Sequence, residues 1–220
     1  MKMFKLAVFD LDGTLVNSIF DLADAVNTAL SEKGYPVHET DEYYFMVGNG
    51  AKKLCERALP EDRRTEEEIV SLQRRFSEVY AQNCLNKTRP YEGMPELVKR
   101  LREAGIMCAV ASNKPDSFSG EIVAALFPEV RFDLVRGKRD GVPTKPQPQI
   151  VYNIAAELGA DLAEAVFIGD SCVDVQTAHN AGLPCIGCVW GFRGEAELKA
   201  NNCEYIAQTP DDIFRIIAGG

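Results

Sequence analysis

Two aspartates that follow a short apolar run near the start of the chain constrain its fold more than any other feature. Residues 5–9 are mostly apolar and predict a short buried strand, and Asp10 and Asp12 come directly after it. Side chains two residues apart on a strand point the same way, so both carboxylates can face one reacting atom. Gly13 permits a tight turn, and Thr14 adds a hydroxyl. Like charges here destabilise a fold, but they suit a divalent cation that prefers oxygen ligands, above all Mg²⁺.

The acidic pair alone does not decide the function, because Asp-x-Asp-Gly also occurs in ordinary turns. The next part of the chain, residues 15–86, reads as all-helical. Ser18 and Asp21 have capping-box spacing at the start of a first helix, which Gly34 can end. A polar loop is then expected through residue 41, a second helix over 51–59, and a third that begins at Thr65.

From Arg89 onward the sequence alternates between strands and helices. Strands are expected over residues 106–111, 132–135, 165–168, 184–190 and 205–207, and helices over 94–104, 116–126, 147–158, 171–181 and 210–217. Such alternation predicts a parallel sheet covered by helices on both faces. The expected fold class is therefore α/β, with a Rossmann-like parallel sheet core of residues 1–14 plus 87–220. Residues 15–86 form a small α-helical domain inserted after the first strand.

Polar residues follow three of the predicted strands at the edge where ligands bind in open parallel sheets. The first strand contributes Asp10 and Asp12, and the others contribute Ser112, Asn113 and Asp170, with Asp174 one turn into a helix. Lys145 lies in a Pro-rich loop that can hold it in place. Carboxylates can bind a metal while a hydroxyl and an ammonium bind phosphate oxygens, so this set predicts a phosphoryl-transfer site.

These motifs together resemble the haloacid dehalogenase (HAD) superfamily in its phosphatase branch. The stretch from Asp10 to Thr14 matches the first motif of that family, Ser112 the second, Lys145 the third, and Gly169-Asp-Ser-x-x-Asp174 the fourth. The resemblance covers nearly the whole chain, and residues 15–86 lie where the family inserts its small helical cap. It implies a Mg²⁺-dependent hydrolase of phosphate esters.

The resemblance implies a chemical role for the two aspartates of the first motif. Asp10 would attack phosphorus as the nucleophile and become an aspartyl-phosphate. Asp12 would protonate the leaving oxygen and then act as the base for the hydrolytic water. An acid at position 12 favours phosphate ester or anhydride chemistry, because the dehalogenases of the superfamily carry tyrosine there and the phosphonate hydrolases alanine.

The resemblance also implies which residues hold the metal and the phosphate. Mg²⁺ would be bound by the carboxylates of Asp10 and Asp170 and the backbone carbonyl of Asp12, with Asp174 behind them. Phosphoryl oxygens would be bound by Ser112, Lys145 and the backbone N–H groups near Leu11 and Asn113. Each residue taken alone has a structural alternative: Ser112 as a turn cap, Lys145 as a solvated loop lysine, and Asp174 as part of a capping box with Ser171.

Within the superfamily the chain resembles the phosphoglycolate phosphatases, through residues 9–18, 21–30, 47–50 and 57–59. It departs from that group at Asn17, where aspartate is usual. Gly48, Asn49 and Gly50 precede an expected helix, and glycines there can present backbone N–H groups to an anion. Our hypothesis is that this cap loop reads the leaving group of the substrate; a simple turn is the alternative.

The expected reaction is hydrolysis of a small phosphomonoester, 2-phosphoglycolate. A pyrophosphatase, a sugar-phosphate phosphatase or phosphoglucomutase, and a nucleotidase stay open as alternatives, because a fold does not fix the substrate. A non-catalytic binding or regulatory module is an alternative of another class. A two-component receiver domain would carry its acceptor aspartate after the third strand and no large insert after the first, and the sequence has neither feature.

Composition bounds the partners and the compartment. With 24 Lys and Arg against 33 Asp and Glu, the net charge is −9, which argues against a broad nucleic-acid-binding face. No signal peptide is expected, and no apolar run has the length of a membrane helix. Seven cysteines without a disulfide framework indicate a reduced cytosol, and Cys185 and Cys188 are expected to pack in the core. We therefore expect a cytoplasmic monomer or homodimer that acts on a small phosphorylated metabolite, without nucleic acid or membrane partners.

Overall fold

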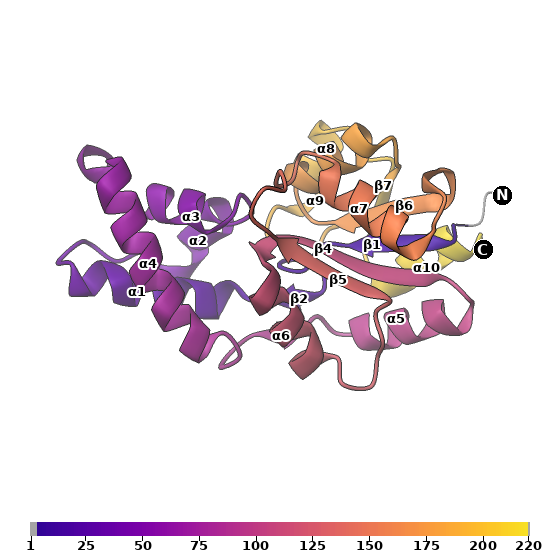
Figure 1. Ribbon diagram of the computed structural model, residues 1–220, viewed down its shortest axis with the longest axis horizontal. Helices are drawn as coiled ribbons and strands as arrows, with labels where there is room; N and C mark the ends of the chain where they lie inside the picture. Colours follow the sequence, from indigo (N-terminus) through magenta and orange to yellow (C-terminus); the bar gives the residue numbers. More distant parts are fainter. Residues whose placement is uncertain (1–3, 220) are drawn as a thin grey trace. The chain divides into compact units, whose positions relative to one another are not determined.

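A computed structural model describes residues 4–219 (Figure 1). The chain divides into two compact units: Met1–Val16 with Pro90–Gly220, called the core unit here, and Asn17–Arg89, called the helical unit. These boundaries fall two to three residues later than the predicted 14/15 and 86/87. The chain passes between the units at two short strands, β2 (Val16–Asn17) and β3 (Arg89–Pro90), which form a separate two-stranded sheet.

The core unit is built on a six-stranded sheet in the order β5-β4-β1-β6-β7-β8. All of its strand pairs are parallel. The strands are β1 (Leu6–Phe9), β4 (Met107–Pro115), β5 (Leu134–Lys138), β6 (Ala165–Gly169), β7 (Cys185–Cys188) and β8 (Tyr205–Ala207). Every residue of β1 is buried, because a parallel strand in the middle of the sheet is covered on both faces.

Helices cover both faces of this sheet (Figure 1). They are α5 (Met94–Glu103), α6 (Asp116–Leu126), α7 (Gln149–Leu158), α8 (Cys172–Ala181), α9 (Gly194–Ala200) and α10 (Pro210–Ala218), with a 3₁₀ turn at Leu162–Glu164. Ile150 and Ile154 of α7 pack with Leu6 and Val8 of β1 in one apolar cluster. The predicted α/β class with a parallel sheet is confirmed.

The helical unit contains α1 (Ile19–Glu32), α2 (Thr40–Met46), α3 (Ala51–Ala58), a 3₁₀ turn at Glu61–Arg63, and α4 (Glu66–Asn83). Helix α1 packs against α2 and α4, and α3 packs against α2 and α4. Thr65 caps α4 as predicted, because its side chain accepts a hydrogen bond from Glu68 N.

Several local predictions were wrong. Helix α2 was not predicted: a loop was expected through residue 41, and residues 42–46 were assigned to no element. The helix buries only Tyr43, so it shows no apolar period, and its capping box starts from Glu39. Helix α9 was not predicted. Strand β4 runs on through Ser112 and Asn113 to Pro115 instead of ending at residue 111.

The predicted capping box at the start of α1 was also wrong. The side chain of Ser18 makes no cap hydrogen bond. Asp21 instead accepts hydrogen bonds from Lys87 N at 2.9 Å, Thr88 N at 2.8 Å and Thr88 Oγ1 at 2.7 Å. Asp21 is buried, and a buried carboxylate needs several donors, which the chain provides far along the sequence where it leaves the helical unit.

Candidate active site

The register of the sheet brings the predicted polar residues to one edge. Phe9, the last residue of β1, lies level with Val110 of β4 and Ile168 of β6. The residues that come next on these three strands therefore lie side by side at this edge of the sheet. Asp10 continues the ladder, since its N–H donates to Ile168 O at 2.8 Å.

Lys145 lies at the centre of this edge. Its Nζ is 2.8 Å from Asp10 Oδ1 and 2.7 Å from Asp174 Oδ1, and only 2% of its side chain is exposed. Asn113 fixes the backbone of Lys145 through two hydrogen bonds, from Lys145 N at 2.8 Å and to Lys145 O at 3.1 Å. Lys145 is therefore a buried, paired lysine and not a solvated loop residue.

Asp174 both caps a helix and belongs to the candidate site, two roles that the sequence analysis gave as alternatives. Its Oδ2 accepts hydrogen bonds from the N–H and hydroxyl of Ser171 at 3.1 and 2.7 Å, which completes a capping box at the start of α8. Its Oδ1 pairs with Lys145. The same carboxylate thus caps a helix and holds the lysine.

Three buried carboxylates form a group that can hold a cation. Asp10, Asp170 and Asp174 each offer an oxygen, and these atoms lie within 4.8 Å of one another. Together with Lys145 the formal charge is −3 + 1 = −2. An oxygen-only donor set with this excess charge fits Mg²⁺. The Asp12 carboxylate is outside this group, whereas Asp174 is inside it.

Burial and mutual repulsion perturb these acids strongly. Burial raises the pKa of Asp10 to about 7, although Lys145 opposes the shift. Burial, together with the charges of Asp174 and Asp10, raises the pKa of Asp170 well above its usual range. Burial alone would lower the pKa of Lys145, but the carboxylates of Asp10 and Asp174 more than offset this and raise it. Perturbed acids of this kind are typical of catalytic and metal sites.

Two glycines let the backbone approach Asp170 closely. Gly13 has φ +90°, and a Cβ atom on it would collide with the Asp170 carboxylate. A Cβ on Gly191 would collide with the same side chain, and the neighbouring Phe192 N–H donates to Asp170 Oδ2 at 2.7 Å. The sequence analysis missed Gly191 and Phe192. The available signal was a glycine directly after the strand predicted over 184–190, at the same edge of the sheet.

The sequence analysis also missed Lys114. Its Nζ lies 3.2 Å from Asp12 Oδ1, and its backbone N–H donates to Ser112 Oγ at 3.1 Å. Ser112 therefore accepts a hydrogen bond from the backbone two residues later, as the alternative of a turn cap predicts. Since these residues lie in the last part of β4, which borders β1, they lie beside Asp12 on the same edge.

Gly48, Asn49 and Gly50 belong to the helical unit and connect α2 to α3. Gly48 and Gly50 have φ of +113° and +81°, and Gly50 precedes the first residue of α3. Arg57 holds this loop: it donates to Asn49 Oδ1 at 2.9 Å and to Met46 O at 2.8 Å. The loop is thus fixed within its own unit.

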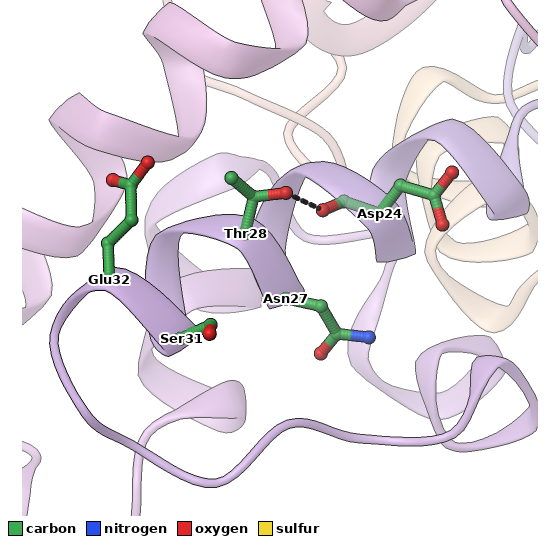
Figure 2. A pocket seen from close by; sticks show the side chains of 5 residues that line it. All are labelled: Asp24, Asn27, Thr28, Ser31 and Glu32. Carbon is green, nitrogen blue, oxygen red and sulfur yellow. Dashed lines mark hydrogen bonds between the residues drawn. The ribbon is translucent and has the colours of Figure 1, made fainter.

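A separate pocket of about 570 Å³ lies along α1 (Figure 2). Its lining is Asp24, Asn27, Thr28, Ser31 and Glu32. Within this lining, Asn27 accepts hydrogen bonds from His38 N and the Tyr43 hydroxyl. The Thr28 hydroxyl donates to Asp24 O, and Glu32 forms an ion pair with Arg75. Because these groups are satisfied by the protein itself, the pocket carries no chemistry comparable to the acid cluster.

Two further predictions concern the whole chain. All seven cysteines are free, and Cys185 and Cys188 are buried in β7. Within residues 4–219, none of the helices combines the length and the apolar character needed to cross a membrane.

The similarity of this chain to known proteins covers residues of both units. A model of the haloacid dehalogenase-like hydrolase family matches residues 7–188. The phosphoglycolate phosphatase of Mannheimia succiniciproducens is 33% identical over 222 residues, covering 98% of this chain and 99% of that protein. The crystal structure of a predicted phosphoglycolate phosphatase from Haemophilus somnus matches with TM-score 0.88 and 30% identity, over 98% of this chain and 99% of that chain. A crystal structure from Lactobacillus delbrueckii subsp. bulgaricus matches with TM-score 0.94 and 30% identity over 100% of both chains.

Proposed function

The chain belongs to the haloacid dehalogenase-like hydrolase family, and on this basis we propose that it is a Mg²⁺-dependent phosphatase of 2-phosphoglycolate. The observation that supports the chemistry best is the buried network in which Lys145 bridges Asp10 and Asp174. The names of the relatives support the substrate, since the Mannheimia succiniciproducens protein is a phosphoglycolate phosphatase. The seven free thiols are compatible with a reducing cytoplasm.

Asp10 is the proposed nucleophile. Its carboxylate oxygen attacks phosphorus, an aspartyl-phosphate forms, and the bond from phosphorus to the leaving oxygen breaks. Asp12 gives its proton to the leaving oxygen, so the product departs as an alcohol. Asp12 then takes a proton from water, which attacks phosphorus, releases inorganic phosphate and regenerates Asp10.

The surrounding residues bind and orient. Lys145 is held by Asn113 and lies against Asp10, so its ammonium can also reach a phosphoryl oxygen of the substrate. Ser112 and the backbone N–H groups near Leu11 and Asn113 bind the other oxygens. Asp10, Asp170 and the Asp12 carbonyl would hold Mg²⁺, with Asp174 beside them in the same acidic group, and the ion would supply positive charge that lets an anionic nucleophile approach an anionic phosphate.

Phosphate release with Mg²⁺ tests the class and the substrate together. The panel is 2-phosphoglycolate, pyrophosphate, β-glucose 1-phosphate, nucleoside monophosphates and an aryl phosphate. We expect 2-phosphoglycolate to be the best substrate, and Asp10→Asn to lose at least about 10⁴-fold in kcat. Turnover that survives in Asp10→Asn would contradict the nucleophile. Broad, weak turnover that the variant loses would keep the mechanism and contradict the substrate.

The loop of Gly48, Asn49 and Gly50 is the proposed reader of the leaving group. Two observations support this role. Arg57 donates hydrogen bonds both to Asn49 and to Met46 at the end of α2, which fixes the loop. Gly50 directly precedes the N-terminus of α3, where backbone N–H groups can bind an anion. Asn49→Ala is expected to raise KM for 2-phosphoglycolate about tenfold and to leave the aryl phosphate unchanged, because an aryl group offers this loop no anion. Asn86→Ala, an exposed change in the same unit, is the matched control. An unchanged ranking of substrates would mean that the loop is a simple turn.

A further inference from the structure

Lys114 is a buried lysine that the mechanism above does not use. Only 5% of its side chain is exposed, and its ammonium faces the carboxylate of Asp12, whose side chain is 14% exposed. Removing an ammonium from water costs free energy, so a buried lysine is retained where its charge is needed. We propose that Lys114 is a positioning residue for Asp12, holding that carboxylate where it delivers a proton to the leaving oxygen. This inference rests on the proposed function.

The sheet explains why Lys114 reaches Asp12. Strand β1 ends at Phe9, whereas its parallel neighbour β4 continues to Pro115. From the register Phe9↔Val110, the overhanging residues of β4 run beside the segment that carries the two acids. Lys114 can thus pair with Asp12 from the end of β4, where the pairing with β5 shifts register between Ala111 and Pro115 and resumes at Pro115↔Lys138.

The two sides of this overhang serve different parts of the site. Lys114 pairs with Asp12, and its N–H donates to Ser112 Oγ. Asn113, between them, holds the backbone of Lys145. One strand therefore positions both lysines.

Each reacting carboxylate then has its own ammonium. Lys145 faces Asp10 and Asp174, while Lys114 faces Asp12. Without Lys114, the Asp12 side chain would lose this ammonium while it stands beside a group of formal charge −2. Repulsion would then turn it away from the leaving oxygen.

The leaving group provides the test. An alkoxide is a poor leaving group and needs the proton from Asp12, whereas an aryl oxide leaves without it. For Lys114→Met we expect kcat/KM for a simple alkyl phosphate to fall about 10²-fold, and that for an aryl phosphate to fall less than about threefold. The ratio kcat/KM is the right quantity, because it reports the first, bond-breaking step. Lys99→Met, an exposed change on α5, is the matched control.

A second variant and a double-mutant cycle make the test specific. Lys114→Arg keeps the charge and is expected to recover part of the alkyl rate; it also serves if Lys114→Met fails to fold. In an Asp12→Ala background, Lys114→Met is expected to have no further effect on the alkyl phosphate, because the residue acts through Asp12.

Three outcomes would overturn the proposal. Equal losses on both substrates would indicate a structural role. A loss confined to 2-phosphoglycolate, carried by KM, would show that Lys114 binds the carboxylate of that substrate. An unchanged or faster alkyl rate would show that Lys114 does not help Asp12 as an acid. Failure of the proposed function itself looks different, because the wild-type protein would then hydrolyse neither phosphate, or Asp10→Asn would stay active.

Discussion

The ion pairs of the candidate site and the surface ion pairs of the helical unit differ in how far their charges are removed from water. In the core unit Lys145 and Asp174 are 2% and 1% exposed, and their charged atoms lie 2.7 Å apart. In the helical unit the pair of Lys52 with Glu66 is 52% and 70% exposed. Exposed pairs are worth about 0–1 kcal/mol, whereas buried charges interact strongly and are costly to keep. The buried group is therefore the one whose retention needs a functional reason.

Asp21 shows that burial alone does not mark chemistry. It is the buried carboxylate of the helical unit, and its partners are backbone N–H groups and one hydroxyl. Its lone pairs are satisfied by neutral donors. The core cluster instead has a formal excess charge of −2, which a bound cation or protonation of its acids would reduce. Excess charge, more than burial, distinguishes the candidate active site.

The largest effect in this comparison is expected from Gly13→Ala. The substitution strains a residue at φ +90° and drives a Cβ atom into the Asp170 carboxylate. We expect kcat/KM to fall at least about 10²-fold through weaker metal binding, with a loss of about 2 kcal/mol in stability. Gly34→Ala is the matched control, since Gly34 has φ +73° with nothing within 4 Å. It should cost about 1 kcal/mol and leave activity intact. If Gly13→Ala and Gly34→Ala had similar activities, the close approach of the Gly13 backbone to Asp170 would not matter for catalysis.

Asp21→Ala should lower the free energy of unfolding by about 3 kcal/mol, because it leaves buried donors of Lys87 and Thr88 without an acceptor. Urea titration measures this change. Asp24→Ala on the same helix removes an exposed pair with Lys87 and should lower the free energy of unfolding far less than Asp21→Ala. The folded fraction of Asp21→Ala should keep the kcat of the wild type. A lower kcat in that fraction would show that Asp21 contributes to catalysis as well as to stability.

Asp10→Asn should stabilise the metal-free protein at neutral pH. Burial raises the folded-state pKa of Asp10 to about 7, above its ordinary 3.8. The folded state therefore holds a proton that the unfolded chain has released, and wild-type stability falls as pH rises from about 4 to about 7. Asparagine has no proton to lose, so the variant should gain about 2 kcal/mol over wild type above pH 7 and little near pH 4. Thermal unfolding in EDTA measures this, and saturating Mg²⁺ should reverse the order.

The smallest effect is expected from Arg75→Met on α4. Arg75 pairs with Glu32 and Glu78, but 39% of its side chain is exposed. The change should lower the midpoint of urea unfolding only slightly, and less still in high salt, without an effect on kcat. A loss of several kcal/mol would show that the charges of the helical unit are not mainly solvated.

Local patterns were enough to predict most of the fold. The apolar run before Asp10 predicted β1, and the alternation after Arg89 predicted a parallel sheet, because both signals are periodic and short-ranged. Thr65 was predicted as a cap from the glutamates that follow it, and the structure confirms this. Helix α2 was missed since a helix with Tyr43 as its only buried residue leaves no periodic signal.

The sequence by itself determined which side chains follow the strands, and thereby placed Asp10, Ser112 and Asp170 at one edge of a parallel sheet. It also determined the family, through motifs that keep their order along the chain. Only the tertiary structure decided which charges meet: Lys145 with Asp10, Lys114 with Asp12, and Phe192 N–H with Asp170. These pairs join residues far apart in the chain, and they depend on the strand order β4-β1-β6-β7 and its register. Local periodicity carries no information about strand order, because that order is set by how the whole sheet packs.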